Sequence, residues 1–373
     1  MSSQTLLISN LKTKILNSFE KKVKNNKEMS TGFFLIHSDK YNIHWKTASN
    51  FDSKVFVHPD QPYHFASIGK TITSVMVSIL FENDLINFNE KISKYLDDLV
   101  LKGLHFFKGK DYSSEILVKQ LLNHTSGIAD YYTDKNKDKI RGVDLMISNP
   151  EHFWSPIETI DWVKNNLSAK FPPGKGFHYS DTNYQLLGLI IEKITGLKLD
   201  QAFHKFIFDP LEMSNTYQIF YSEPKIKSEF NIVDFYYNDL NLSKAKSISM
   251  SWASGGVVST SEDMLKFIKS IVENKIIKKE TFEKMCDFVK MSFNLYYGYG
   301  IMNFRFPMMP KKYHIWGNSG SIGAFMYYNP SFDTYMIGSF HKQGYQVQPI
   351  IFLFSTMQKV NKFINENLKI KVF

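Results

Sequence analysis

The chain has 373 residues, of which 43% are hydrophobic and 22% are charged. These proportions exclude a disordered or collagen-like chain and are typical of a globular protein with a large core. The net charge of +9 comes from 45 basic and 36 acidic residues, and the lysines are scattered along the chain. The charge therefore indicates solvated faces, and no basic stripe or nucleic-acid-binding motif accompanies it.

The content of cysteine and histidine excludes several other classes of protein. Cys286 is the single cysteine, so no intramolecular disulfide and no cysteine-rich zinc site can form. The eleven histidines are dispersed, without His-x-His or His-Glu-x-x-His spacing. We therefore predict neither a metal nor a cofactor. No apolar run approaches the ~20 residues that span a bilayer, so we also predict no integral membrane segment. Without a secretory pattern in residues 1–23, the sequence as written favours a cytoplasmic protein.

The first part of the chain alternates between helical and strand patterns. Residues 1–23 carry an apolar residue at every fourth position from Leu7 onward and predict an amphipathic helix. Residues 31–37 and 41–48 predict two strands joined by a turn. From Ser67 the apolar residues fall on one stripe, which predicts a buried helix that ends at Asn83.

The rest of the chain is first helical and then strand-rich in pattern. Residues 84–245 are mostly helical, and their clearest helix runs from about 182 to Gly196. Strand patterns return at residues 255–259, 291–306, 313–316, 324–329 and 334–341, and residues 348–368 predict a last helix. This order predicts an α+β fold in which one antiparallel sheet is flanked by helices and joins both ends of the chain. We expect a sheet domain of residues 1–83 and 246–373, an inserted helical domain of residues 84–245, and an active site between them.

Ser67 and Lys70 are the first candidates for catalysis. They lie three residues apart at the start of a predicted helix, so their side chains share a face. A serine hydroxyl needs a neighbouring base, and a lysine serves as one only if its pKa is lowered. The spacing alone is also consistent with an ordinary helix-capping serine, because Ser-x-x-Lys recurs elsewhere. The other occurrences begin at Ser9, Ser18, Ser222, Ser243 and Ser339.

Further motifs favour the catalytic interpretation. Residues 121–128 read Leu-Leu-Asn-His-Thr-Ser-Gly-Ile, residues 177–184 read Phe-His-Tyr-Ser-Asp-Thr-Asn-Tyr, and Asn-Ser-Gly follows at 318–320. With residues 65–70, these segments resemble the serine β-lactamase-related family. The resemblance is to the branch with class C β-lactamases, D-alanyl-D-alanine carboxypeptidases, D-aminopeptidases and several esterases. It spans roughly residues 60–340, and segments at 210–216 and 255–264 also fit it.

The resemblance implies a role for each matched residue. Ser67 would be the acylated nucleophile, Lys70 its hydrogen-bonded partner, and Tyr179 a second proton carrier. A phenol holds its proton to about pH 10, but an adjacent lysine ammonium would favour the phenolate. The backbone N–H groups of Ser67 and Ser321 would form the oxyanion hole. The residues expected to orient Lys70 or bind substrate are Asp181, Asn318, Ser319 and Gly320.

Two departures from the family pattern bear on the substrate. Asp181 stands where asparagine is usual, and its charge should keep Lys70 protonated and shift the base role towards Tyr179. Asn318 replaces the usual lysine or histidine, which removes the cation that would bind a substrate carboxylate. We therefore predict a serine hydrolase that acts through an acyl-enzyme on an uncharged small-molecule ester, amide or peptide-like substrate. The alternatives are a β-lactamase or D-alanyl-D-alanine carboxypeptidase, and a catalytically silent binding protein of the same fold. The oligomeric state stays open.

Two other hydrolase motifs are each incomplete in this sequence. Gly69-Lys70-Thr71 could end a phosphate-binding loop, but His64 stands where that loop needs its first glycine. The nearest approach to Gly-x-Ser-x-Gly is residues 317–320, which lack the final spacing. His124 is interpreted as a structural histidine beside the site, and Gly127 as a glycine that a positive φ requires.

Overall fold

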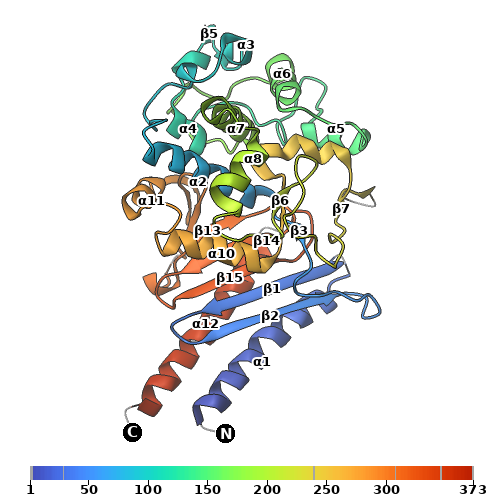
Figure 1. Cartoon of the computed structure of the whole chain (residues 1–373), viewed down its shortest axis with the longest axis vertical. Helices are drawn as coiled ribbons and strands as arrows, with labels where there is room; N and C mark the ends of the chain where they lie inside the picture. The colour runs from blue at the N-terminus through green and yellow to red at the C-terminus, as the bar shows by residue number, and fades with distance from the viewer. Residues whose placement is uncertain (1–2, 28, 238–239, 307, 345–346, 372–373) are drawn as a thin grey trace.

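The fold is built on a twisted antiparallel sheet (Figure 1). The computed structural model describes residues 3–27, 29–237, 240–306, 308–344 and 347–371. Within these ranges the largest sheet has eight strands in the order β10-β11-β12-β13-β14-β15-β1-β2. The strands are β1 (Thr31–Ser38), β2 (Ile43–Asn50), β10 (Val289–Ser292), β11 (Leu295–Tyr297), β12 (Met302–Phe304), β13 (Ile315–Ser319), β14 (Ala324–Asn329) and β15 (Thr334–Ser339).

Both ends of the chain contribute to this sheet. β1 pairs with β15 in antiparallel register, with Leu35 opposite Ile337. Helices α1 (Ser3–Lys24) and α12 (Val347–Lys371) pack together on one face of the sheet, where Phe19 and Leu353 are buried in one hydrophobic cluster. Figure 1 shows the two helices side by side, with both termini at the same end of the molecule. The predicted α+β architecture is therefore confirmed.

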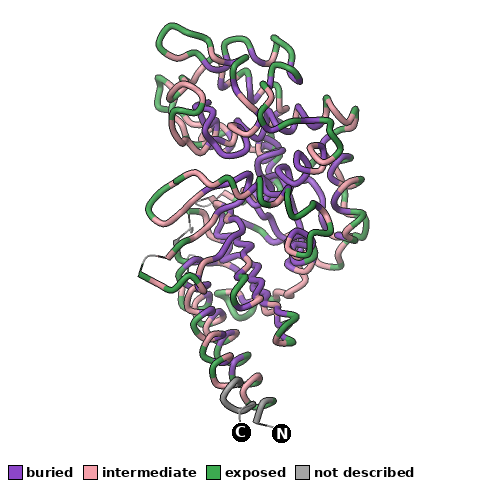
Figure 2. The backbone as a smooth tube through the Cα atoms, turned by 90° about the vertical axis from the view of Figure 1, so that its left-hand side faces the viewer, coloured by how far each residue is buried: buried purple, intermediate pink, exposed green. Residues whose placement is uncertain are grey.

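The other face of the sheet packs against α10 (Ser261–Val272) and belongs to a second, larger hydrophobic cluster, which continues upward into the other helices (Figure 1). Figure 2 shows buried backbone concentrated in the middle of the molecule, where these layers meet. The helices are α2 (Gly69–Glu82), α3 (Asp98–Leu101), α4 (Val118–Leu122), α5 (Gly142–Ser148), α6 (Pro156–Asn166), α7 (Asp181–Thr195), α8 (Leu199–Phe203), α9 (Trp252–Gly255), α10 (Ser261–Val272) and α11 (Lys279–Met285).

Local sequence explains where the clearest helices begin and end. The Ser155 hydroxyl accepts a hydrogen bond from the Glu158 N–H and caps α6, whose first residue is a proline. Gly196 ends α7 in the left-handed conformation with φ 67°, which glycine adopts without steric cost. The predicted helices at 182–196 and 348–368 are thus confirmed within a few residues. Residues 1–2 of the predicted first helix lie outside the described residues.

Several strand predictions need correction. The strand pattern predicted across 291–306 is divided among three short strands, because Asn294 (φ 62°) and Gly300 (φ 68°) reverse or bend the chain. Two-residue strands were not predicted, since such short segments carry no periodicity. They are β3 (Tyr63–His64) and β6 (Tyr217–Gln218), which flank β9 (Val257–Ser259), and the pairs β4 (Phe106–Phe107) with β5 (Lys110–Asp111) and β7 (Tyr236–Tyr237) with β8 (Leu240–Asn241).

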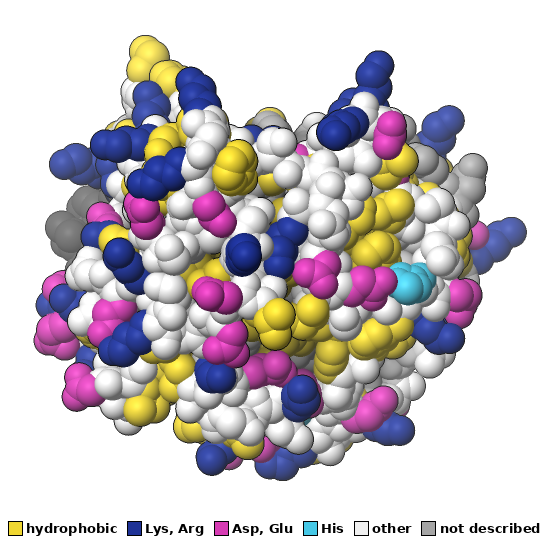
Figure 3. Space-filling model, turned by 90° about the horizontal axis from the view of Figure 1, so that it is seen from above, with side chains coloured by type: hydrophobic (Ala, Val, Ile, Leu, Met, Phe, Trp, Pro, Cys, Tyr) yellow, Lys and Arg dark blue, Asp and Glu magenta, His cyan; other side chains and the backbone are white. Residues whose placement is uncertain are grey.

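The distribution of charge on the surface and the lengths of the helices agree with what the composition predicts. Figure 3 shows lysines, acidic groups and hydrophobic side chains interspersed over the upper face, as expected for scattered charge. Among the described residues, no helix combines the length and apolarity needed to cross a bilayer. The predicted domain boundaries at residues 83 and 245 stay a prediction.

Candidate active site

Ser67 lies on a tight backbone turn at the entrance to α2. A 3₁₀ turn, Ala66–Ile68, precedes the helix, so the α-helix begins two residues later than predicted. Ala66 has φ 46°, a strained conformation for a residue with a Cβ. Gly255 allows this turn to approach α9 closely, because an added Cβ there would lie 3.0 Å from the Ala66 carbonyl carbon. The packing of two segments far apart in sequence therefore presents the Ser67 hydroxyl to the cavity.

Lys70 is fully buried beside Ser67, and its Nζ contacts several oxygen atoms. Its Nζ donates to Ser67 Oγ at 3.1 Å and to the Ser254 carbonyl oxygen at 2.8 Å. The same Nζ lies 2.5 Å from Asp181 Oδ1 in an ion pair. Burial alone lowers the pKa of Lys70, but the Asp181 carboxylate and then Tyr179 outweigh it, so the net pKa is raised. Lys70 is consequently an ammonium in the resting site, as the sequence predicted from Asp181.

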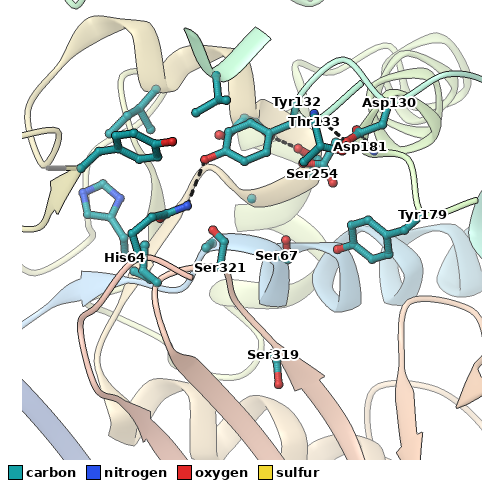
Figure 4. Close-up of a pocket in the computed structure, with 18 of the residues that line it drawn as sticks. His64, Ser67, Asp130, Tyr132, Thr133, Tyr179, Asp181, Ser254, Ser319 and Ser321 are labelled. Atoms are coloured by element: carbon teal, nitrogen blue, oxygen red, sulfur yellow. Dashed lines mark hydrogen bonds between the residues drawn. The ribbon is translucent and has the colours of Figure 1, made fainter. Parts of the chain in front are cut away.

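The Tyr179 hydroxyl points towards Ser67 (Figure 4). Lys70 Nζ lies 5.0 Å from the centroid of its ring. The His124 ring centroid is 4.3 Å away, and the Tyr297 ring meets Tyr179 edge to face at 5.7 Å. Burial raises the pKa of the Tyr179 phenol more than the charge of Lys70 lowers it, so the net pKa lies above its ordinary value. The expectation of a favoured phenolate is therefore corrected: desolvation dominates and the phenol keeps its proton.

Asp181 is held by a second buried carboxyl group that the sequence analysis missed. As the first residue of α7, Asp181 donates its backbone N–H to Asp130 Oδ1 at 2.8 Å. The backbone N–H and the hydroxyl of Thr133 both donate to Asp130 Oδ2, at 2.9 and 2.5 Å. Burial, followed by the charge of Asp181, raises the pKa of Asp130 to about 6. Asp130 therefore fixes the N-terminus of α7 and with it the partner of Lys70.

Asn318 differs from its predicted place. It was expected to line the acyl site, but it is fully buried beneath the site and is not among the cavity-lining residues. Its Nδ2 donates to the Gly300 carbonyl at 3.0 Å, to Thr71 Oγ1 at 3.1 Å and to the Ser67 carbonyl at 3.3 Å. β13 meets the start of α2 here, so the N–H groups of the Asn318 side-chain amide donate to backbone and hydroxyl oxygens of the protein. Asn318 thus packs against the nucleophile turn and does not line the cavity.

Two other predicted residues of this segment face the cavity. Ser319 and Ser321 line it together with Ser67. Ser319 Oγ shares a 2.7 Å hydrogen bond with the Tyr327 hydroxyl. Figure 4 shows Ser321 between His64 and Ser67, with Tyr179 on the opposite side of Ser67. This arrangement brings the Ser321 backbone and the Ser67 turn to one wall of the cavity.

Gly320 makes that approach possible and yields a testable prediction. An added Cβ would lie 2.6 Å from the Phe65 carbonyl oxygen and 3.0 Å from the Ala66 Cβ. Gly320→Ala is expected to push Ser321 away from Ser67 and lower kcat/KM for a small ester by about 10²-fold, comparable to the loss of one oxyanion donor. The control is Gly103→Ala, outside the cavity lining, where the φ of 80° strains the backbone but an added Cβ meets nothing within 4 Å. Equal kcat/KM values for the two variants would contradict the expected geometry.

The cavity has a volume of about 440 Å³ and is lined from several distant segments. Ser67, Tyr179 and Asp181 contribute to it, as do Asp130 and Ser254. Ser254, whose carbonyl oxygen accepts a hydrogen bond from Lys70, was not predicted, and the only local signal for it is the glycine pair that follows. Asp130 could have been found in the segment after Ser126-Gly127. Within the described parts of the chain, no group of three or more His, Cys, Asp or Glu side chains could hold a metal ion.

His124 and Gly127 have the structural roles that the sequence indicated. His124 Nδ1 accepts the Ser180 N–H at 3.1 Å, and its own carbonyl accepts the His178 N–H at 3.0 Å. Burial, then the charges of Lys70 and His178, lower the pKa of His124 well below its ordinary value, so the ring is neutral. Gly127 has φ 79°, as predicted. Both residues shape the loop that supports Tyr179.

An antiparallel sheet that supports a helix with Ser-x-x-Lys at its start, facing a tyrosine, defines the β-lactamase/transpeptidase-like fold class. The family model described as Beta-lactamase matches residues 22–349, and the chain belongs to this family. Penicillin-binding protein 4* of Bacillus subtilis (strain 168) is 28% identical over 159 residues, which cover 41% of this chain and 30% of that protein. The chain thus spans less than a third of this relative's length.

Solved structures have the same fold. A D-stereospecific amidohydrolase from Streptomyces sp. superposes with a TM-score of 0.74 at 22% identity, covering 90% of this chain and 96% of that one. The hydrolase EstCE1, described as having promiscuous acyltransferase activity, gives a TM-score of 0.71 at 15% identity, covering 93% and 98%. At these identities the likeness shows the fold alone.

Proposed function

We propose that the protein is a serine hydrolase that cleaves an uncharged ester or amide through an acyl-enzyme on Ser67. The observation that carries the proposal is the position of Lys70, whose Nζ lies 3.1 Å from Ser67 Oγ and is fixed by Asp181 and Ser254. A buried lysine whose Nζ contacts a cavity-lining serine places a proton-transfer group within reach of the nucleophile. The membership in the Beta-lactamase family supports the same chemistry.

In the proposed reaction, Ser67 Oγ attacks the substrate carbonyl carbon and loses its proton to the Lys70–Tyr179 pair. The backbone N–H groups of Ser67 and Ser321 stabilise the oxyanion. As the bond to the leaving group breaks, Tyr179 gives the departing oxygen or nitrogen a proton. Water then attacks the acyl-enzyme, the same pair accepts its proton, and Ser67 is regenerated.

The charges around the cavity favour an uncharged substrate. Among the described residues that line the cavity, Arg141 is the one arginine or lysine. Its guanidinium is paired with Asp144: Nε donates to Oδ2 at 2.9 Å and Nη2 donates to Oδ1 at 2.6 Å. Asn318, at the position where a cation would meet a substrate carboxylate, is buried and neutral. Asp130 adds a further acidic group to the wall. A carboxylate-bearing β-lactam or peptide would therefore meet no unpaired cation among these residues.

The proposal is tested with p-nitrophenyl butyrate and nitrocefin on the purified protein. We expect turnover of the ester that Ser67→Ala abolishes, and little or no nitrocefin hydrolysis. Efficient nitrocefin hydrolysis would favour the β-lactamase alternative. No turnover above the Ser67→Ala background, with any ester or amide, would overturn the enzyme proposal in favour of a silent binding protein.

The charge state of the site predicts a specific pH dependence. The pKa values of Lys70 and Tyr179 are both raised, so both groups hold protons at neutral pH. The form that can accept the Ser67 proton lacks one of these protons, and its fraction grows about tenfold per pH unit below the pKa values. We therefore expect kcat/KM to rise steadily from pH 6 to pH 9. Asp181→Asn removes the charge that raises the pKa of Lys70 and should move the rise to lower pH. A flat profile in both proteins would contradict this account.

A further inference from the structure

The apolar lining of the cavity divides into two groups that belong to different hydrophobic clusters. Both clusters reach the cavity, so it lies where the two cores meet. The first group, here called the helical-side lobe, consists of Met146, Phe235, Leu242 and Ile248. The second group, here called the sheet-edge lobe, consists of Met291, Leu295, Met302 and Phe304, which lie on β10, β11 and β12. The nucleophile Ser67 thus lies in a cavity with two separate apolar walls.

The sheet-edge lobe lies on the side of Tyr179. Tyr179 packs against the same cluster as Met291 and Leu295. The connection continues through the Tyr327 hydroxyl, which contacts Met302 Sδ at 3.6 Å and shares a hydrogen bond with Ser319. Since Tyr179 supplies the proton to the leaving group in the proposed reaction, the leaving alcohol or amine has to lie on this side.

The helical-side lobe lies on the side of Ser321. The Phe235 ring meets His64 edge to face at 4.9 Å, and Figure 4 shows His64 next to Ser321. Burial lowers the pKa of His64 to about 4, so this wall is uncharged near His64 at neutral pH. In a bound substrate, the carbonyl oxygen points at the backbone N–H groups of Ser67 and Ser321, and the leaving group points towards Tyr179. The acyl chain of the substrate then extends to the helical-side lobe.

We propose that the substrate is a neutral ester or amide with an apolar group on each side of the scissile bond. The acyl chain lies in the helical-side lobe, and the leaving alcohol or amine lies against the sheet-edge lobe. This inference rests on the proposed hydrolase function and adds a substrate class to it. In the step concerned, the Ser67 Oγ–carbon bond forms and the carbon–oxygen or carbon–nitrogen bond breaks. The leaving group departs with a proton from Tyr179, and water later releases the acid.

Two series of esters separate the two lobes. p-Nitrophenyl esters from acetyl to hexanoyl vary the acyl chain, and alkyl acetates from methyl to hexyl, followed by acid release, vary the leaving group. We expect kcat/KM to increase at least tenfold along each series, as apolar methylenes enter an apolar pocket. A constant or falling kcat/KM along either series would overturn the assignment of that lobe.

Paired variants test which lobe contacts the acyl chain and which contacts the leaving group. Leu295→Ala should lower the hexyl-to-methyl preference in the alkyl series about tenfold and leave the acyl series unchanged. Phe235→Ala should do the reverse, and Phe235→Leu, which keeps most of the buried volume, should give a smaller shift in the same direction. The matched controls are Phe293→Ala, at the exposed tip of the β10–β11 hairpin, and Tyr236→Ala, next to Phe235 but outside the lining. Both should retain the wild-type preferences.

The possible outcomes distinguish a failure of the two-lobe assignment from a failure of the proposed hydrolase function. Ser67-dependent turnover with crossed effects of Leu295→Ala and Phe235→Ala supports the two-lobe assignment. Ser67-dependent turnover in which either variant changes both series equally overturns the assignment and leaves the hydrolase proposal in place. Absence of Ser67-dependent turnover with every ester overturns both.

Discussion

Replacing Ser67 with alanine is expected to lower kcat/KM for ester hydrolysis by about 10⁴-fold or more, as the loss of a nucleophile does in other serine hydrolases. The Ser67 hydroxyl interacts with Lys70, which keeps Ser254 and Asp181 as partners, and with Tyr179, which keeps its contact with Lys70. The melting temperature should therefore stay close to that of the wild type. The measurements are steady-state kinetics and thermal unfolding of both proteins.

The matched control for this variant is Ser222→Ala. Ser222 stands in another Ser-x-x-Lys sequence, ending at Lys225, but it does not line the cavity. We expect wild-type kinetics for the control. A Ser67→Ala protein with more than about a hundredth of the wild-type kcat/KM would contradict the role of Ser67, since water alone cannot replace the nucleophile to that extent.

Replacing Lys70 with methionine is expected to lower kcat/KM by roughly 10³-fold, within the range of lost general acid–base catalysis. It should also destabilise the fold by about 3 kcal/mol, because the Asp181 carboxylate loses its buried cation. Kinetics and urea unfolding of the variant measure the two effects separately.

A double variant separates the effect of Lys70 on stability, through its ion pair with Asp181, from its effect on catalysis. Lys70→Met combined with Asp181→Asn removes both members of the ion pair. We expect the free energy of unfolding to recover most of its loss, because no unpaired carboxylate remains, while kcat/KM stays as low as in Lys70→Met. Recovery of activity in the double variant would show that Lys70 acts only through stability.

Much of the fold could be predicted because it follows from local pattern. The period of apolar residues gives α2 and α7, and Gly196 marks a helix end through its conformational freedom. Strand patterns at both ends of the chain predicted one shared sheet, which the pairing of β1 with β15 confirms. The three-residue spacing of Ser67 and Lys70 predicted their contact, since the 3₁₀ turn and the first turn of α2 bring side chains three residues apart onto one face.

What could not be predicted depends on packing between distant segments. The Ser254 carbonyl reaches Lys70 across 184 positions of sequence, and no local pattern encodes such a contact. Asn318 occupies a family motif position, yet its burial under the Ser67 turn follows from how β13 meets α2. The raised pKa of Tyr179 likewise depends on how completely its phenol is desolvated, which a sequence does not specify.

The most direct test of the central claim is to locate the covalent adduct formed with a fluorophosphonate probe, by intact-mass and peptide mass spectrometry. We predict one probe per chain, attached to the peptide that contains Ser67, with no labelling of Ser67→Ala. Pretreatment with a slowly hydrolysed ester should protect the same residue. An unlabelled wild-type protein, or an adduct on a different serine, would contradict the proposal that Ser67 carries the acyl group.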